Sequence, residues 1–284
     1  MDKATLIGLL LGGVAVVGGH YLEGGSMGMI LQITALVIVF GGTLGAVSLS
    51  FSGAQLKQTL RELPQVFKEP EDHGPAHLTR IVDLAYRARR EGLLSLEKDL
   101  MDVSDLFMRR ALQLVVDGHH PQQVREIMEL ELAQWDEEGL TPSRVMEAAG
   151  GYAPTIGILG AVLGLIQVMQ HLTEPAKLGT GVAVAFVATI YGVASANLIF
   201  LPLAQKLKLR HRSLMLVKEM VLEGILSLAQ GDHPQLVAEK MRGFLVGRGA
   251  RAAASLASPK VRWLTPRVQP KKESHEATPS SSSQ

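Results

Sequence analysis

The chain has 284 residues, of which 47% are hydrophobic and 19% are charged, and its formal net charge is +1. This apolar content is too high for a disordered chain. The absence of cysteine excludes a disulfide-stapled protein, a thiol nucleophile and a cysteine-ligated metal centre. These averages do not separate a soluble protein from a membrane protein, so the positions of the charges along the chain decide the class.

Four long windows contain no Asp, Glu, Lys or Arg. They cover residues 4–22, 24–56, 148–173 and 178–205. Each is long enough to cross a hydrocarbon core of ~30 Å at ~1.5 Å per residue. A segment in lipid must satisfy its own backbone hydrogen bonds, so we predict four transmembrane helices. We place them at residues 1–22, 28–50, 148–173 and 178–205.

A cleaved signal peptide is the alternative interpretation of the first window, because Lys3 precedes an apolar run. However, the run ends in Gly-Gly-His-Tyr-Leu-Glu without a small-residue cleavage site, and a second span follows after a short turn. We therefore interpret it as a span.

The basic residues predict how the spans are oriented. The turn 23–27 carries no Lys or Arg and the loop 174–177 carries one, whereas residues 57–147 carry 12 and the chain from Lys206 onward carries 14. Lys and Arg near spans stay on the cytoplasmic side, so both short connections face outward and both termini lie inside. A basic group directly after the fourth span fits an anionic inner leaflet. It consists of Lys206, Lys208, Arg210 and Arg212.

The segments outside the membrane are predicted to be helical. Residues 51–147 form a cytoplasmic domain, in which 68–75 is expected to be a turn because two prolines and a glycine interrupt any helix. One helix is expected over 95–116, because an apolar stripe recurs there at helical spacing. The stripe consists of Leu96, Leu100, Val103, Phe107, Ala111 and Leu114.

Further helices are expected over 121–138, from Thr141 toward the third span, and within 206–250. Residues 251–284 are rich in Ser, Pro, Ala and Lys and are expected to be disordered. The predicted fold class is an all-α integral membrane protein, with four spans, a helical cytoplasmic domain between the second and third, and a helical C-terminal cytoplasmic extension.

Small residues recur four apart in every span, which lets helix backbones approach closely in lipid. Packing within one chain and packing between subunits both fit this pattern. The positions are Gly8 and Gly12, Gly41 and Gly45, Gly160 and Gly164, and Ala188, Gly192 and Ala196.

The spans contain no carboxylate, although ion-conducting paths usually need an ionisable group in the membrane. If the protein conducts ions, a partner must supply that group. The spans do contain prolines, Pro154 and Pro202, each of which removes a backbone donor and favours a kink or a hinge. They also contain uncharged polar side chains that act either as structural bonds or as path groups, notably Thr155, Thr189, Ser195 and Asn197.

No motif for enzyme chemistry is visible, because the chain lacks a phosphate-binding glycine loop, a nucleophile elbow and a zinc-protease motif. His73 and His77 are four apart, but we expect Gly74-Pro75 between them to prevent a helical ligand pair. We therefore expect no enzyme activity, no metal, no cofactor and no nucleic-acid partner.

Four motifs resemble the MotA/PomA/MotC family of bacterial flagellar stator subunits, in order and in spacing, over residues 1 to about 250. They are Leu22-Glu23-Gly24-Gly25, Arg89-Arg90-Glu91-Gly92-Leu93-Leu94-Ser95-Leu96-Glu97, Ala153-Pro154-Thr155-Ile156-Gly157-Ile158-Leu159-Gly160, and Ala188-Thr189-Ile190-Tyr191-Gly192 with Leu201-Pro202-Leu203-Ala204.

The resemblance implies a multi-pass protein of the bacterial inner membrane that forms a homo-pentamer around a MotB-like dimer, whose transmembrane Asp carries the coupling ion. Pro154 and Pro202 resemble the family prolines that couple ion passage to movement, and Thr189 resembles the threonine of the ion path. By the same resemblance, three charged residues meet the rotor protein FliG. They are Arg89, Arg90 and Glu97.

The coupling ion is predicted from one position in the third span. Sodium-type relatives have a Gly-Thr pair where this chain has Gly160-Ala161, so Ala161 lacks the hydroxyl that helps replace the hydration shell of sodium. We therefore expect proton coupling. An ExbB/TolQ-type energiser is an alternative that has one span before the cytoplasmic domain instead of two, and a membrane scaffold without ion flux is a third possibility.

Overall fold

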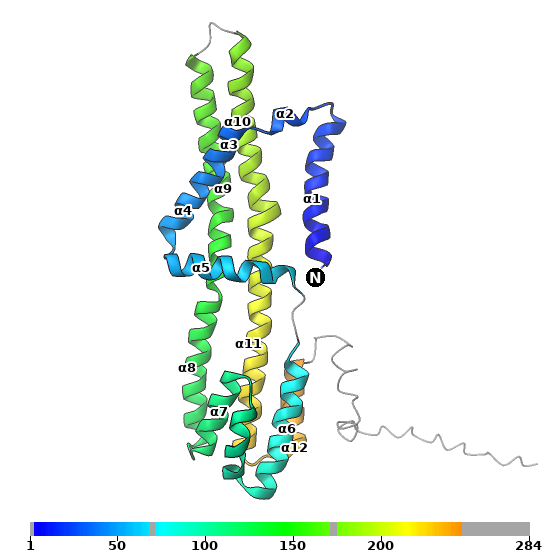
Figure 1. Cartoon of the computed structure of the whole chain (residues 1–284), viewed down its shortest axis with the longest axis vertical. Helices are drawn as coiled ribbons and strands as arrows, with labels where there is room; N and C mark the ends of the chain where they lie inside the picture. The colour runs from blue at the N-terminus through cyan, green and yellow to red at the C-terminus, as the bar shows by residue number, and fades with distance from the viewer. Residues whose placement is uncertain (1–2, 69–71, 171–174, 246–284) are drawn as a thin grey trace, which may run out of the picture.

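The computed structural model describes residues 3–68, 72–170 and 175–245, and every regular element in these ranges is a helix, which confirms the predicted all-α class. Two long antiparallel rods run through the molecule (Figure 1). In the first, α8 (Pro121–Gly139) leads into α9 (Thr141–Gln170). In the second, α10 (Pro175–Ser195) continues through a π-helical turn, η4 (Ala196–Phe200), into α11 (Leu201–Ala229).

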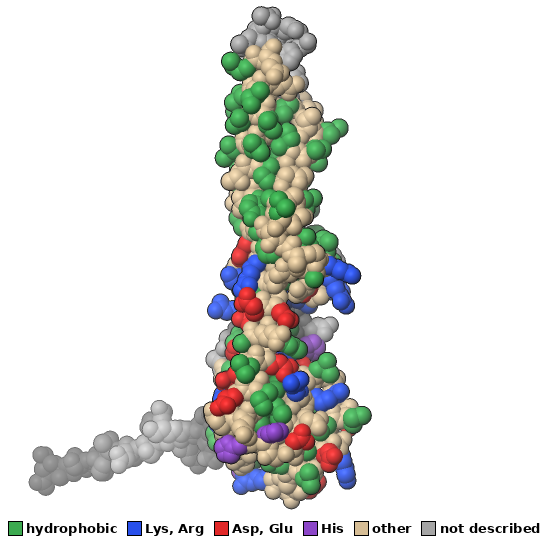
Figure 2. Space-filling view, turned by 90° about the vertical axis from the view of Figure 1, so that its left-hand side faces the viewer, with side chains coloured by type: hydrophobic (Ala, Val, Ile, Leu, Met, Phe, Trp, Pro, Cys, Tyr) green, Lys and Arg blue, Asp and Glu red, His purple; other side chains and the backbone are tan. Residues whose placement is uncertain are grey.

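Four helical segments are long and apolar enough to cross a membrane. Two belong to the rods, and two precede the cytoplasmic domain, within Thr5–Leu22 and Ile33–Ser50. Figure 2 shows hydrophobic and uncharged side chains over the upper half of the molecule, with acidic, basic and histidine side chains below. The N-terminal elements are α1 (Lys3–Leu22), α2 (Met27–Ile30), α3 (Ile33–Leu36), the π-helical turn η1 (Val37–Gly41) and α4 (Gly42–Ser50).

The second span differs from the prediction of one helix over 28–50, because the chain is extended at Leu31 and Gln32. Tyr191 on α10 explains the break. Its hydroxyl donates to the carbonyl oxygen of Ile30 at 2.6 Å and accepts from the backbone N–H of Gln32 at 3.4 Å. These bonds satisfy backbone groups that the interrupted helix leaves open, as a segment in lipid requires.

Helix α5 (Gly53–Glu62) crosses the rods just below the apolar half (Figure 1). Ser52 caps it, since its hydroxyl accepts from the backbone N–H of Gln55 while the Gln55 side chain accepts from the backbone N–H of Ser52. A 3₁₀ turn, η2 (Leu63–Phe67), follows. The amphipathic α5 therefore marks the level at which the chain leaves the membrane.

The lower half has its own hydrophobic core, built where α8 and α11 meet four shorter elements. These elements are α6 (Gly74–Glu91), the 3₁₀ segment η3 (Leu93–Asp102), α7 (Leu106–Val116) and α12 (Pro234–Leu245). The largest fully buried side chains of this core include Leu78, Ile81, Phe107, Met128, Met220, Ile225 and Met241.

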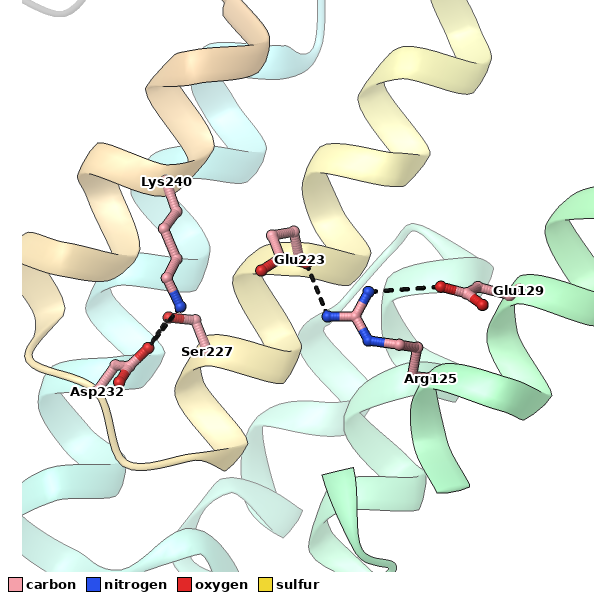
Figure 3. A network of polar contacts seen from close by, with 6 residues as sticks. All are labelled: Arg125, Glu129, Glu223, Ser227, Asp232 and Lys240. Carbon is pink, nitrogen blue, oxygen red and sulfur yellow. Dashed lines mark hydrogen bonds and ion pairs between the residues drawn. The ribbon is translucent and has the colours of Figure 1, made fainter. Parts of the chain in front are cut away.

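Polar contacts at the edge of this core fix α11 to its neighbours (Figure 3). The Arg125 guanidinium on α8 lies 3.0 Å from the carboxylate of Glu223 on α11. Lys240 on α12 lies 2.8 Å from Asp232, which also accepts from the hydroxyl of Ser227. These two bonds hold the pKa of the Asp232 carboxyl below its usual range.

The single helix expected over 95–116 is wrong, although most of its apolar stripe is buried as predicted. The chain forms η3, extends at Val103, and starts again at α7, where the Asp105 side chain accepts from the backbone N–H of Met108 at 2.8 Å. Asp105 therefore acts as a helix cap, which the apolar spacing alone does not reveal. Similarly, Gly74 and Pro75 form the first turn of α6 instead of a linker, a position that proline favours.

Two predicted segments extend outside the described ranges. The tail 251–284 lies beyond them, and so does Glu174 of the predicted outer loop. Residues 175–177, expected in that loop, belong to the first turn of α10. The boundary predicted at residue 205 is not a helix end, because α11 continues from the apolar half into the lower core.

Candidate functional site

A close contact between membrane helices lies where α9 crosses α10. A Cβ on Gly192 would lie 2.5 Å from the carbonyl oxygen of Ala153, and a Cβ on Gly157 would lie 2.9 Å from that of Ala188. Gly164 is equally close to Ala185. The small residues of these two spans therefore pack within the chain, and larger side chains would force the backbones apart.

Gly8, Gly41 and Gly45 behave differently. A Cβ on any of them would meet no atom within 4 Å in the described part of the chain. By contrast, Gly12 and Gly42 of the same spans do pack inside the chain, against the side chains of Leu198 and Ile156, so only part of each small-residue face is left open.

Pro154 lies inside α9, half-buried, next to this crossing. Proline has no N–H, so the Gly150 carbonyl loses its usual helical partner. The Cα of Pro154 would lie 3.2 Å from a Cβ on Gly192, and a Cβ on Gly150 would lie 2.7 Å from the side chain of Leu201. The weakened turn of α9 therefore faces both α10 and the start of α11.

Thr189 is a half-buried residue of α10 at the same crossing. Its hydroxyl donates to the carbonyl oxygen of Ala185 on its own helix at 3.3 Å. This bond is long, and the hydroxyl keeps its acceptor capacity. Ala161 is half-buried on α9, beside Gly160, whose Cβ would lie 2.9 Å from that of Ala188. The structure thus brings Pro154, Thr189 and Ala161 to one helix pair.

Pro202 stands apart from these three. It is exposed at the second position of α11, directly after η4. The π-helical turn accommodates the absence of a backbone N–H at Pro202. Such turns occur often at functional sites. The Asn197 side chain in η4 donates to the carbonyl oxygen of Val193 at 2.9 Å, which satisfies a second backbone group.

The chemistry that these residues can perform is limited by their types. No Asp, Glu, Lys or Arg lies between residues 148 and 173 or between 178 and 205, and the one histidine of these windows, His171, lies outside the described residues. The crossing therefore offers hydroxyls, backbone carbonyls and two deformable turns, but no group that can take and release a proton by itself.

The charged residues predicted to meet a rotor protein lie at the opposite end of the molecule. Arg89 and Arg90 occupy the last turn of α6, and Glu97 lies on η3; all three side chains are exposed. Gly92, with φ +85°, reverses the chain between the two elements. Glycine adopts this conformation without strain. The structure therefore brings the two elements that carry these charges together on one surface.

Asp99 is a residue of this surface that the sequence did not single out. Its nearly buried carboxylate accepts from Arg87 Nη1 at 2.6 Å, and Arg80 lies 3.9 Å away. Asp99 lies 12 residues after Arg87, and the Gly92 turn between them ends the helix, so helical periodicity does not relate the two positions. No signal in the sequence therefore reveals this pair.

Comparison with known proteins gives the class. Residues 100–220 match the model of the MotA/TolQ/ExbB proton channel family, and residues 6–92 match that of the Motility protein A N-terminal region. Motility protein A of Bacillus subtilis is 34% identical over 86% of this chain and 91% of its own length. The chemotaxis protein PomA of Vibrio alginolyticus is 32% identical over 89% of this chain and 98% of its own length.

Comparison with solved structures leads to the same class of protein. The flagellar MotAB stator complex from Bacillus subtilis superposes with a TM-score of 0.80 at 33% identity, covering 90% of this chain and 100% of the matched one. MotAB of C. jejuni gives 0.82 at 29% identity, covering 88% and 98%.

The chain belongs to the MotA/TolQ/ExbB proton channel family. Its branch is that of motility protein A, the flagellar stator subunits, which confirms the resemblance seen in the sequence. The N-terminal match covers the two spans before the cytoplasmic domain, the feature that separates this branch from the ExbB/TolQ alternative.

Proposed function

We propose that this stator subunit conducts protons together with a MotB-like partner and converts their flow into rotation. The observation that carries the proposal is the α9–α10 crossing, which combines a proline-weakened turn with a polar path that lacks Asp, Glu, Lys and Arg. A transmembrane Asp of the partner supplies the missing group. Relatives solved as MotAB complexes support this choice of partner.

In this proposal five copies of the chain surround the partner's spans in the bacterial inner membrane, with both termini in the cytoplasm. The open small-residue face at Gly41 and Gly45 supports assembly with further helices. When a proton binds to the partner's Asp and then leaves it, the turns at Pro154 and Pro202 let α9 and α11 shift. Thr189 lines the path of the proton. The surface of Arg89, Arg90 and Glu97 transmits the movement to FliG by charge pairing.

Proton leak measures the first half of this function. The full chain and its partner are reconstituted in vesicles with an internal pH dye, and the leak of the wild type is compared with that of Pro154→Ala. We expect Pro154→Ala to lose most of the flux, because the restored hydrogen bond stiffens α9. Ile158→Val, an exposed change one turn further along the same helix, is the matched control. Equal flux from all three proteins would overturn the role of Pro154.

Rotation measures the second half. A strain that lacks this gene is expected to build flagella that do not turn, after any second stator set has been removed. Normal swimming in that strain would exclude the function. A membrane scaffold without ion flux would give no proton leak in the vesicle experiment.

A further inference from the structure

An apolar hollow opens between α1 and the start of α11, on the membrane side of the basic group. It has a volume of about 390 Å³. Its walls are mostly apolar, and they come from the first turns of α1, from η2, and from η4 with α11. They include Leu9, Phe67, Leu198, Ile199 and Leu203.

A second hollow of about 300 Å³ adjoins the first, because Lys206 lines both. Its walls carry Lys68, Lys206 and Arg210, and no Asp or Glu of the described ranges lines either hollow. The two hollows together form a groove that is apolar at one end and cationic at the other.

The position of Lys206 places this groove at the membrane boundary. It is the first charged residue after the uncharged window 178–205, and its ammonium group contacts the Thr5 hydroxyl on α1. Arg210 lies one helical turn further from the membrane and donates from Nη1 to the carbonyl oxygen of Gln65 at 2.8 Å. Arg210 has five N–H donors, so this bond leaves donors for an anion.

We propose that the groove binds one anionic phospholipid of the inner leaflet, with an acyl chain in the apolar hollow and its phosphate between Lys206, Arg210 and Lys68. An amphiphile with an anionic head group complements both ends of the groove, because its chain is apolar and its head group is negatively charged. The bound lipid fills the gap between α1 and the rods. It joins α1, which otherwise touches the rods mainly through Gly12 and Leu198, to the elements that hold Pro202.

Native mass spectrometry of the full chain with its partner, in nanodiscs of phosphatidylglycerol and phosphatidylcholine, tests this. The wild type is expected to retain phosphatidylglycerol in preference to phosphatidylcholine. The double variant Lys206→Gln, Arg210→Gln should weaken retention by about 5-fold per cation removed, or roughly 25-fold in all.

The matched control removes the same charge from another face of the same helix. Lys208 and Arg212 line a separate hollow with Asp136 and Glu219, so Lys208→Gln, Arg212→Gln should leave retention unchanged. Equal losses in both double variants would mean that the lipids respond to general surface charge and would overturn the site.

The apolar end needs its own test, in case the charge variants fold poorly. Gly8 lines the hollow and has open space at its Cβ, so Gly8→Phe should fill the groove and displace the lipid. Gly19→Phe on the same helix, also with open space, is the control.

A photoreactive residue in place of Leu9 identifies the occupant directly. Cross-linking to phosphatidylglycerol supports the proposal, whereas cross-linking only to a second copy of the chain overturns it. Glycerol phosphate serves as a competitor, and full displacement of the lipid by it would overturn the part of the proposal that places an acyl chain in the apolar hollow. None of these readouts depends on ion flux, so they stand apart from the proposed function.

Discussion

Arg87 donates a hydrogen bond from Nη1 to each carboxylate oxygen of Asp99 at 2.6 Å, across the Gly92 turn. Arg87 belongs to α6, which carries Arg89 and Arg90, and Asp99 belongs to η3, which carries Glu97. The pair therefore fixes the relative position of the exposed charges that are proposed to meet the rotor. A bond of this kind between charged groups is strong and directional.

Asp99→Asn should loosen this surface without removing any exposed charge from it. The change replaces a charge-assisted contact, and we expect a loss of about 1–2 kcal/mol in the stability of the lower domain, reduced from the usual range because Arg87 is half exposed. Swimming should slow while proton leak stays normal. Thermal unfolding of the purified complex and swim-ring diameter measure the two effects.

Asp102→Asn changes the same charge at an exposed position of the same segment and is the control for Asp99. If both variants unfold and swim alike, Asp99 has no positioning role.

Gly192→Ala should separate α9 from α10. The added Cβ would lie 2.5 Å from the carbonyl oxygen of Ala153 and 3.1 Å from the Cα of Gly157, where only backbone can give way. Overpacking of this kind costs about 1–3 kcal/mol. Fluorescence-detected gel filtration after heating measures the loss of the complex. Gly151→Ala on α9, where a Cβ meets nothing within 4 Å, should behave as wild type; an unaffected Gly192→Ala would refute the close crossing.

His77 makes the lower domain sensitive to acid. Burial holds the pKa of His77 below its usual 6.5, an effect that His73 and Lys218 reinforce and that Asp105, 4.0 Å away, opposes. The unfolded chain therefore binds a proton at this position more readily than the folded one. The resulting stability is complete above about pH 6.5 and is lost as the pH falls from there through the folded pKa.

The measurement is the unfolding temperature of the complex between pH 7.5 and 5.5. His77→Gln cannot be protonated in this range and should flatten the profile, whereas the exposed His233→Gln should keep the wild-type slope. A steep profile that persists in His77→Gln would assign the acid sensitivity to other groups.

Much of this architecture could be predicted from the sequence, because missing charges and small residues four apart are strong local signals. The four spans and the Gly160, Gly164 and Gly192 packing face follow from them. Breaks set by distant partners could not be predicted. The interruption at Gln32 depends on Tyr191, 159 residues further along the chain. The Arg87–Asp99 pair likewise could not be predicted, because the glycine turn between the two residues interrupts the helical periodicity.

The coupling ion remains a prediction that rests on Ala161. A sodium ion needs oxygen ligands to replace its hydration shell. Gly160 packs on Ala188 at the α9–α10 crossing. The residues that follow them in the chain are Ala161 and Thr189, and of these two only Thr189 has a hydroxyl. That hydroxyl already donates to the carbonyl oxygen of Ala185. One hydroxyl is a poor cage for sodium, whereas a proton needs none. Swimming of a strain with this stator alone should therefore continue without sodium and stop when a protonophore is added, and strict sodium dependence would reject proton coupling.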